Sequence, residues 1–435
     1  MQANNYVTDS SGNSKFRMFE SFNHLMSEMK SADGEHLELM PSCAAGMRVT
    51  GKLNTQKLIA AVNAAYRDID SMRAVIVREK EENYFRVLNE YSISNELIRP
   101  DGDTPDERYK NVTEQCQRDV SDPGFYSECG CPIKLYELGE DDYFFLIALN
   151  HHFGDYESLA LIIKKIMLGY YSLPGGKGIN KNGIIDFHEF YESYLASEKH
   201  KEDERYWESL NEGIEKLFVR NPQDDTVSEL TPMDCMSIFP LEQLTKTARK
   251  YKTSVPNLMQ SVYMLALSCV YNTSESAVAV AFANRQNKEF ADTVAHLSTL
   301  LLTRTDIPDN ADAKDFFKQV MNATAENMKH APMIIKNRKT DYFIFDYMTK
   351  KTNSSPFKGA KTEVWTPKSF DINSFDFDSI FTASVETDDK LIMSYNFNKS
   401  NYSNADFIKL RDKVIAMVAL LSENGDVTVS ELKNA

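Results

Sequence analysis

Residues 146–163 read LIALNHHFGDYESLALII, and this stretch decides the interpretation of the whole chain. It continues an apolar run, YFFLIAL at residues 143–149. A strand that is apolar at every position is typical of the centre of a sheet with both faces covered. The later residues, from 158 onward, repeat apolar side chains at helical spacing. We therefore expect the segment NHHFGD, residues 150–155, to lie between the end of a buried strand and a helix.

His151 is the first candidate for chemistry in this segment. A histidine at the exit of a buried strand is held in place and shielded from water on one side, which suits a general base. Asp155, four residues on, has two possible roles: it accepts a hydrogen bond from the imidazole, or it pairs with a distant arginine and holds the loop. A purely structural histidine is the alternative that these residues alone leave open.

Zinc is a second alternative, because His151, His152 and Asp155 are all ligand types. Neighbouring residues on a strand point to opposite faces, however, and no further cluster of His or Cys supplies the remaining ligands. We therefore expect no metal.

The bulk composition restricts the class of protein. A chain of 435 residues is too long for one ordinary core and suggests two lobes, and its 42% hydrophobic and 26% charged residues are typical of a soluble globular protein. The net charge of −15 argues against nucleic acid or an anionic membrane as the partner. Residues 1–14 lack the apolar core of a signal peptide, and no stretch is long enough for a membrane span.

Six cysteines are few for this length and suggest reduced thiols, so we expect a cytoplasmic protein. They are Cys43, Cys116, Cys129, Cys131, Cys235 and Cys269.

The first half of the chain is predicted to mix helices and hairpins. Residues 53–66 have helical spacing, with Asn54 or Thr55 as the N-cap. Residues 72–88 and 133–149 each predict a hairpin. The Gly- and Pro-rich run 174–183 is the expected connection between lobes. One polar helix is expected over 187–210.

The second half has the same mixed character. We expect helices over residues 241–251, 255–270 and 404–421, a strand over 277–283, and a hairpin over 380–395. The fold class is therefore α/β with mixed sheets.

The segment 146–163 resembles the HHxxxDG signature of condensation domains of peptide synthetases, and the HxxxD signature of their relatives such as chloramphenicol acetyltransferase. The resemblance continues in family order along nearly the whole chain, which makes it specific. The matching segments are SGNSKFRMFESF (11–22), RDIDSMRAV (67–75), DFHEFYESYL (186–195), AVAVAFANRQNKEF (277–290) and VAHLSTLLLTRTDI (294–307).

The resemblance implies two chloramphenicol-acetyltransferase-like lobes, residues 1–178 with the HxxxD motif and residues 179–435, in a V with a tunnel between them. It implies a free-standing condensation enzyme that transfers an acyl or aminoacyl group from a carrier-protein or coenzyme A thioester to an amine. The product would be an amide in natural-product biosynthesis. An O-acyltransferase that forms an ester and a catalytically silent scaffold are the two alternatives.

The implied substrates follow from the same resemblance. The donor would be an acyl group on phosphopantetheine, with no permanently bound cofactor. The partners would be acyl or peptidyl carrier proteins acting in trans and a small amine or alcohol acceptor.

The register of the motif assigns roles by resemblance. Counting back four residues from Asp155 places the catalytic base at His151, so that Asn150 replaces the first histidine of the family pattern. Asp155 is expected to pair with Arg17 and hold the loop. Tyr156 replaces the family's glycine and would narrow the substrate channel or donate a hydrogen bond to a substrate.

Other residues are expected around the site. Ser158 falls where condensation domains often carry serine, and His296 is expected to be structural. The residues predicted for the substrate channel are Tyr156, Ser158, Asn284 and Arg285.

Overall fold

The computed structural model describes residues 6–18, 43–80, 82–214, 217, 230–231, 233–331, 343–349, 356–367, 380–397 and 402–435. These residues form two compact units. The first comprises the described residues within Met1–Ser197, Arg285–Ser298 and Asn353–Phe370. The second comprises those within Glu198–Asn284, Thr299–Thr352 and Asp371–Ala435. The expected lobe boundary after residue 178 stays a prediction, as do the V and its tunnel.

The main sheet of the first unit has the strand order β12-β3-β7-β6, and every neighbouring pair is antiparallel. Its strands are β3 (Cys43–Thr50), β6 (Ile133–Gly139), β7 (Asp142–Leu149) and β12 (Lys361–Trp365). The predicted hairpin and the central position of its second strand are confirmed. The register pairs Cys43 with Leu149, so the start of β3 lies beside the end of β7.

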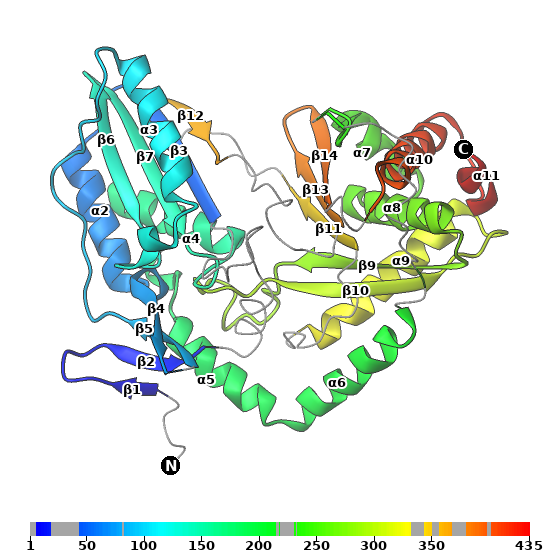
Figure 1. Ribbon diagram of the computed structural model, residues 1–435, viewed down its shortest axis with the longest axis horizontal. Helices are drawn as coiled ribbons and strands as arrows, with labels where there is room; N and C mark the ends of the chain where they lie inside the picture. The colour runs from blue at the N-terminus through cyan, green and yellow to red at the C-terminus, as the bar shows by residue number, and fades with distance from the viewer. Residues whose placement is uncertain are drawn as a thin grey trace. The chain divides into compact units, whose positions relative to one another are not determined.

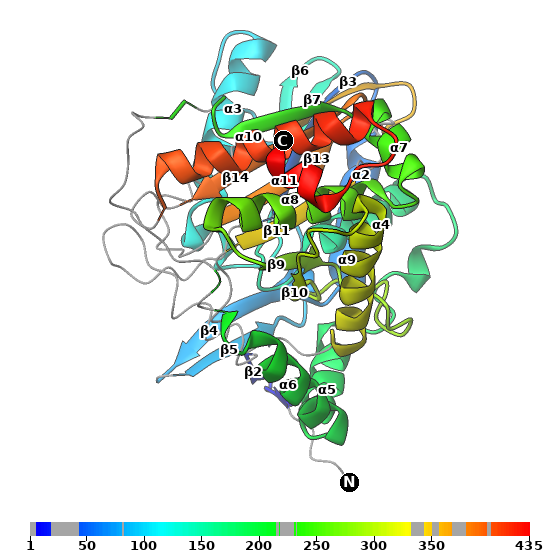
Figure 2. The ribbon, with the colours of Figure 1, turned by 90° about the vertical axis from the view of Figure 1, so that its right-hand side faces the viewer.

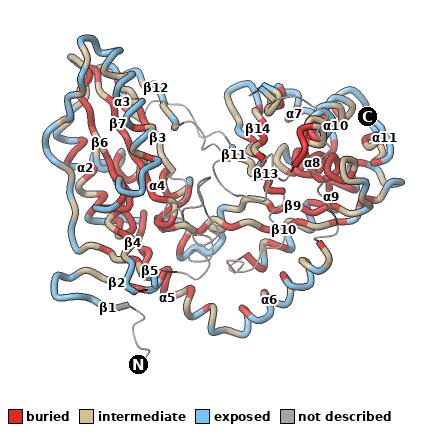
Figure 3. Tube along the Cα trace, in the orientation of Figure 1, coloured by how far each residue is buried: buried red, intermediate tan, exposed pale blue. Residues whose placement is uncertain are grey.

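Helices cover both faces of this sheet, which explains why β7 is apolar throughout. On one face, Val112 and Cys116 of α3 (Pro105–Asp119) pack against Phe144 and Leu146. Figures 1 and 2 show α2 (Thr55–Asp68) and α4 (Tyr156–Tyr170) together on the opposite face. Buried residues run along the sheet strands in Figure 3.

A second sheet in the first unit has the order β1-β2-β5-β4. Its strands are β1 (Tyr6–Thr8), β2 (Ser14–Arg17), β4 (Ala74–Glu79) and β5 (Glu82–Val87). The predicted hairpin over 72–88 is confirmed as β4 and β5, and Asn54 caps α2 as predicted by accepting from the Lys57 N–H. Residues 19–22 of the segment matched at 11–22 lie outside the described residues.

The second unit is built on a six-stranded mixed sheet with the order β10-β9-β11-β13-β14-β8. Strand β11 pairs in parallel with β9 and β13, and the other neighbours pair antiparallel. The strands are β8 (Met236–Pro240), β9 (Glu275–Phe282), β10 (Thr299–Asp306), β11 (Phe343–Met348), β13 (Ile380–Glu386) and β14 (Lys390–Phe397).

Helices gather on one face of this sheet in Figures 1 and 2. They are α7 (Leu241–Lys250), α8 (Val255–Tyr271), α9 (Ala313–Asn327), α10 (Asn404–Glu423) and α11 (Val429–Asn434). The helices predicted over 241–251, 255–270 and 404–421 are thereby confirmed. Among the described residues, no helix is both long enough and apolar enough to cross a membrane.

The single helix predicted over 187–210 is wrong: two helices, α5 (Ile184–Leu195) and α6 (Glu198–Asn211), replace it. Each helix has a buried face of its own. Phe187 of α5 contacts Phe290 in the first unit, whereas Trp207 of α6 donates to the His330 carbonyl in the second. The break separates two helices that are buried in different cores.

Gly46 offers a test of how tightly the first unit is packed. A Cβ atom added to Gly46 would lie 2.3 Å from Cζ of Phe144 and 3.0 Å from Cε3 of Trp365. Gly46→Ala should therefore destabilise the protein by about 1–3 kcal/mol, measured by urea unfolding. Gly425→Ala is the control, since its added Cβ would meet nothing within 4 Å. Equal urea midpoints for the two variants would contradict this packing.

Candidate active site

The loop of residues 150–155 is fixed at both ends. The backbone N–H of Asn150 donates to the Gly130 carbonyl at 2.8 Å, and Phe153 is completely buried. Gly154 is required by space, because a Cβ there would lie 2.5 Å from Cδ2 of Leu149 and 2.8 Å from Cβ of Ser158. The chain therefore leaves β7 and enters α4 along one closely packed path.

Asp155 closes the loop as the N-cap of α4, and both carboxylate oxygens are fully used. Its Oδ1 accepts from the backbone N–H of Ser158 at 2.8 Å and from Arg285 Nη2 at 2.8 Å. Its Oδ2 accepts from the backbone N–H groups of Leu297 and Ser298 at 3.2 and 3.1 Å. Burial opposes the charge, but Arg285 and the surrounding donors outweigh it, so the pKa of Asp155 is lowered.

Arg285 is the buried partner of Asp155, with side-chain exposures of 12% for the arginine and 4% for the aspartate. Its Nη1 also donates to the carbonyls of Ala291 and Thr293, at 3.2 and 2.7 Å. The guanidinium thus joins the loop of residues 285–298 to the loop that carries His151. A planar guanidinium presents several N–H donors in a fixed geometry, so one arginine can bond several acceptors at once.

The predicted pairing of Asp155 with Arg17 is wrong. Arg17 bonds Glu82 at 2.9 Å, and 67% of its side chain is exposed. The physical reason is strand alternation: Phe16 points into the core with 1% exposure, so its neighbour on β2 points to solvent.

His151 is half-buried, and its Nδ1 lies 2.9 Å from the Gly154 carbonyl oxygen. Because a carbonyl only accepts, we assign the proton of the neutral ring to Nδ1, which leaves Nε2 as a base. The ring stacks on His296, with centroids 4.4 Å apart and planes inclined by 16°. Nδ1 of His296 in turn lies 2.7 Å from the His151 carbonyl oxygen.

His296 therefore belongs to the site, although its sequence position only suggested a structural residue. Its pKa is lowered to about 3 by burial and by His151, so it stays neutral against the His151 ring. No spacing in the sequence points to this contact, since it depends on how the loop of residues 285–298 returns to α4.

Cys43 is a second residue that the sequence analysis missed. It lies at the start of β3, opposite Leu149 at the end of β7, and it acts electrostatically on the His151 ring. Burial lowers the pKa of His151, but Cys43, Asp155 and the Gly154 carbonyl outweigh burial and bring it to about 9. The β3–β7 register, rather than any motif, brings the two residues together.

His152 differs from His151 in its burial and in the direction of its pKa shift. It is fully buried, and its Nδ1 lies 2.9 Å from Oδ1 of Asn150, which is itself buried. Burial and the neighbouring His151 lower the pKa of His152 to about 3. Asn150 thus anchors the inward-pointing histidine. Within the described ranges, no three or more His, Cys, Asp or Glu side chains are grouped to hold a metal ion.

The residues predicted for the substrate channel have different environments. Tyr156 is 50% exposed at the first turn of α4, where burial, Glu157 and Cys43 raise the pKa of its phenol. Ser158 is fully buried, with its hydroxyl 2.9 Å from Asp155 Oδ1, so with Arg285 it supports the loop. Asn284 adopts the left-handed region (φ 51) that asparagine tolerates, and it belongs to the second unit.

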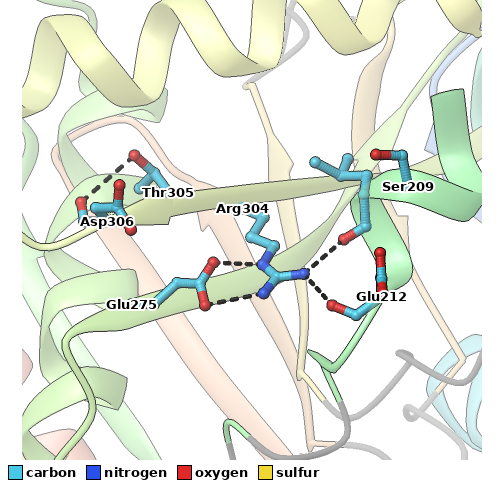
Figure 4. Close-up of a pocket in the computed structure, with 7 residues that line it drawn as sticks. Ser209, Glu212, Glu275, Arg304, Thr305 and Asp306 are labelled. Carbon is cyan, nitrogen blue, oxygen red and sulfur yellow. Dashed lines mark hydrogen bonds and ion pairs between the residues drawn. The ribbon is translucent and has the colours of Figure 1, made fainter.

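A pocket of about 450 Å³ lies in the second unit, and none of these residues lines it (Figure 4). Arg304 crosses it, pairs with Glu275, and donates to the carbonyls of Leu210 and Glu212 at 3.0 and 2.6 Å. Three carboxylates against this one arginine give the lining a net negative charge, which disfavours a phosphate. The lining residues are Ser209, Leu210, Glu212, Glu275, Arg304, Thr305 and Asp306.

A family model described as Condensation domain matches residues 40–435. The chain therefore belongs to the condensation-domain family. Bacitracin synthase 1 of Bacillus licheniformis is 22% identical over 317 residues, which are 69% of this chain. The chain spans only 6% of the length of that relative.

Solved structures agree on the fold. The condensation domain of the Monacolin K polyketide synthase MokA superposes with a TM-score of 0.74 at 15% identity, covering 95% of this chain and 99% of that one. The X-domain solved in complex with OxyB from teicoplanin biosynthesis gives a TM-score of 0.69 at 11% identity, covering 99% and 97%. The predicted chloramphenicol-acetyltransferase-like α/β fold is confirmed.

Matched variants of Arg285 and Arg17 distinguish between these two candidate partners of Asp155. Arg285→Met leaves a buried carboxylate without its charge partner and should cost about 3–5 kcal/mol of unfolding free energy. Arg17→Met removes an exposed pair and should leave the urea midpoint nearly unchanged. Combining Asp155→Asn with Arg285→Met should cost less than the sum of the two single changes. A larger loss from Arg17→Met than from Arg285→Met would contradict the assignment.

Proposed function

We propose that this chain transfers an acyl or aminoacyl group from a phosphopantetheine-linked thioester to an amine and so forms an amide in natural-product biosynthesis. The observation that carries the proposal is how the His151 ring is placed and held. It is half-buried, its Nδ1–H is engaged by the Gly154 carbonyl, and its loop is held by the buried pair of Asp155 and Arg285. Membership of the condensation-domain family supplies the reaction class.

The chemistry uses Nε2 of the neutral His151 ring, and the neutral share of the ring grows as the pH rises toward its pKa of about 9. The acceptor amine attacks the thioester carbonyl carbon and must lose a proton as the new C–N bond forms. His151 Nε2 takes that proton and returns it to the pantetheine sulfur as the C–S bond breaks. Asp155 does not touch the substrate, because every one of its acceptor positions faces the protein.

The proposed donors are acyl or peptidyl carrier proteins, or coenzyme A. A peptide synthase among the relatives of this chain supports a carrier-bound donor. An alcohol acceptor would use the same base and give an ester, and the product distinguishes the two cases because hydroxylamine cleaves an ester and leaves an amide intact.

A catalytically silent binding module is the second candidate, and Tyr156 favours it. Its half-exposed phenol stands directly after Asp155, near Cys43, where the family pattern has a glycine. A structural neighbour, the X-domain, is itself known in a complex with another protein, OxyB.

Intact-mass analysis of acyl-loaded carrier proteins and an amine acceptor tests the proposal. His151→Ala should lower the transfer rate by about 10²–10⁴-fold, because it removes the base. His200→Ala is the control, since His200 lies on α6 beside Glu204 in the second unit. Full turnover by His151→Ala would overturn the proposal. Stable carrier binding without turnover, equal in the wild type and His151→Ala, would favour the binding module.

A further inference from the structure

The backbone around His296 is fixed by contacts that do not involve its ring. The N–H of Val294 donates to Oδ1 of Asn180 at 2.9 Å. The carbonyl of Ala295 accepts from the Ser158 hydroxyl at 2.9 Å. The His296 side chain therefore projects from a segment whose position is already set, and it can act as a rigid support for whatever it touches.

Two contacts join the His296 side chain to His151. The two rings stack, with centroids 4.4 Å apart and planes inclined by 16°. Nδ1 of His296 lies 2.7 Å from the His151 carbonyl oxygen. Because a carbonyl only accepts, we assign the proton of the neutral His296 ring to this nitrogen. One side chain thus holds both the ring and the backbone of the candidate base.

The other polar contact of the His151 ring is the bond from Nδ1 to the Gly154 carbonyl, at 2.9 Å. A single hydrogen bond does not fix the tilt of an imidazole, because rotation about the bond between Cβ and the ring has broad minima. A flat ring against one face restricts that rotation. The stack on His296 therefore supplies the restraint that the Gly154 bond lacks.

The stack is also compatible with a charge on His151. Burial and His151 lower the pKa of His296 to about 3, whereas the pKa of His151 is raised to about 9. At neutral pH a charged ring therefore lies against a neutral aromatic ring, which is an attractive arrangement. The other titratable groups that act on the two rings are Cys43, Asp155 and His152.

We propose that His296 is a positioning residue that stacks on the His151 imidazole and holds it in one orientation, with Nδ1–H on the Gly154 carbonyl and Nε2 left for the substrate. This inference rests on the proposed function and adds to it the side chain that keeps the base aligned. His296 takes no part in the proton transfer itself.

Three substitutions separate the stack from the hydrogen bond. His296→Phe keeps an aromatic ring against His151 and removes the Nδ1–H donor. His296→Asn keeps a side-chain N–H donor and removes the ring, and His296→Ala removes both. Asp155 stays held in all three variants, because Leu297 and Ser298 bond it through their backbone N–H groups.

Nitrogen NMR of the His151 ring, at a pH above its pKa of about 9, tests the proposal without any substrate. The wild type and His296→Phe should carry the proton of the neutral ring on Nδ1. His296→Ala and His296→Asn should show a mixture of both tautomers, because a ring free to tilt exchanges its Gly154 bond for water. The His151→Ala spectrum assigns the signal among the eight histidines. An unchanged tautomer in His296→Ala, or one preserved by Asn and lost with Phe, would overturn the proposal.

Turnover of a carrier-bound donor and an amine adds a kinetic readout. His296→Ala should lower kcat by about 10–10²-fold and leave KM nearly unchanged, because a misoriented base costs rate in the transition state and not substrate binding. His296→Phe should recover most of kcat, and His200→Ala is the control. Undiminished kcat in His296→Ala would contradict the positioning role and leave the proposed function standing. Absence of wild-type turnover with every donor would count against the proposed function, and the NMR tautomer would still decide the role of His296.

Discussion

The buried ion pair between Asp155 and Arg285 is the interaction on which the candidate site depends. A charge pair with exposures of 4% and 12% is stable only when its remaining donors and acceptors are satisfied, and here they are. The carboxylate accepts hydrogen bonds from the backbone N–H groups of Ser158, Leu297 and Ser298. The guanidinium donates hydrogen bonds to carbonyls of its own loop. Two loops far apart in the sequence thus become one rigid support for His151.

The rest of the site follows from that support. Gly154 lets the chain turn where a larger residue would clash, and its carbonyl fixes the proton on Nδ1 of His151. The β3–β7 register pairs Cys43 with Leu149, at the end of the strand that leads into this loop, and Cys43 helps to raise the pKa of His151. The site is therefore a product of sheet register and loop closure, and only the histidine and the aspartate belong to one sequence motif.

The sequence alone predicted the strand, the loop and the helix around residues 150–155, because apolar periodicity and turn residues are local signals. It also separated His151 from His152 through the spacing to Asp155. The pairing of Asp155 could not be predicted in the same way: Arg17 and Arg285 were both available, and strand alternation at Phe16 decided against the first. Cys43 and His296 were missed because long-range packing places them, and no local pattern carries that information.

The central claim is that the Asp155–Arg285 pair holds the His151 loop in its working conformation, and hydrogen exchange tests it most directly. The backbone amides of Ser158, Leu297 and Ser298 donate to Asp155, so they should be protected in the wild type. The account predicts that Arg285→Met speeds exchange in peptides covering residues 150–158 and 291–298, and leaves exchange in β2 and β5 unchanged. Unaltered protection of those peptides in Arg285→Met would contradict it.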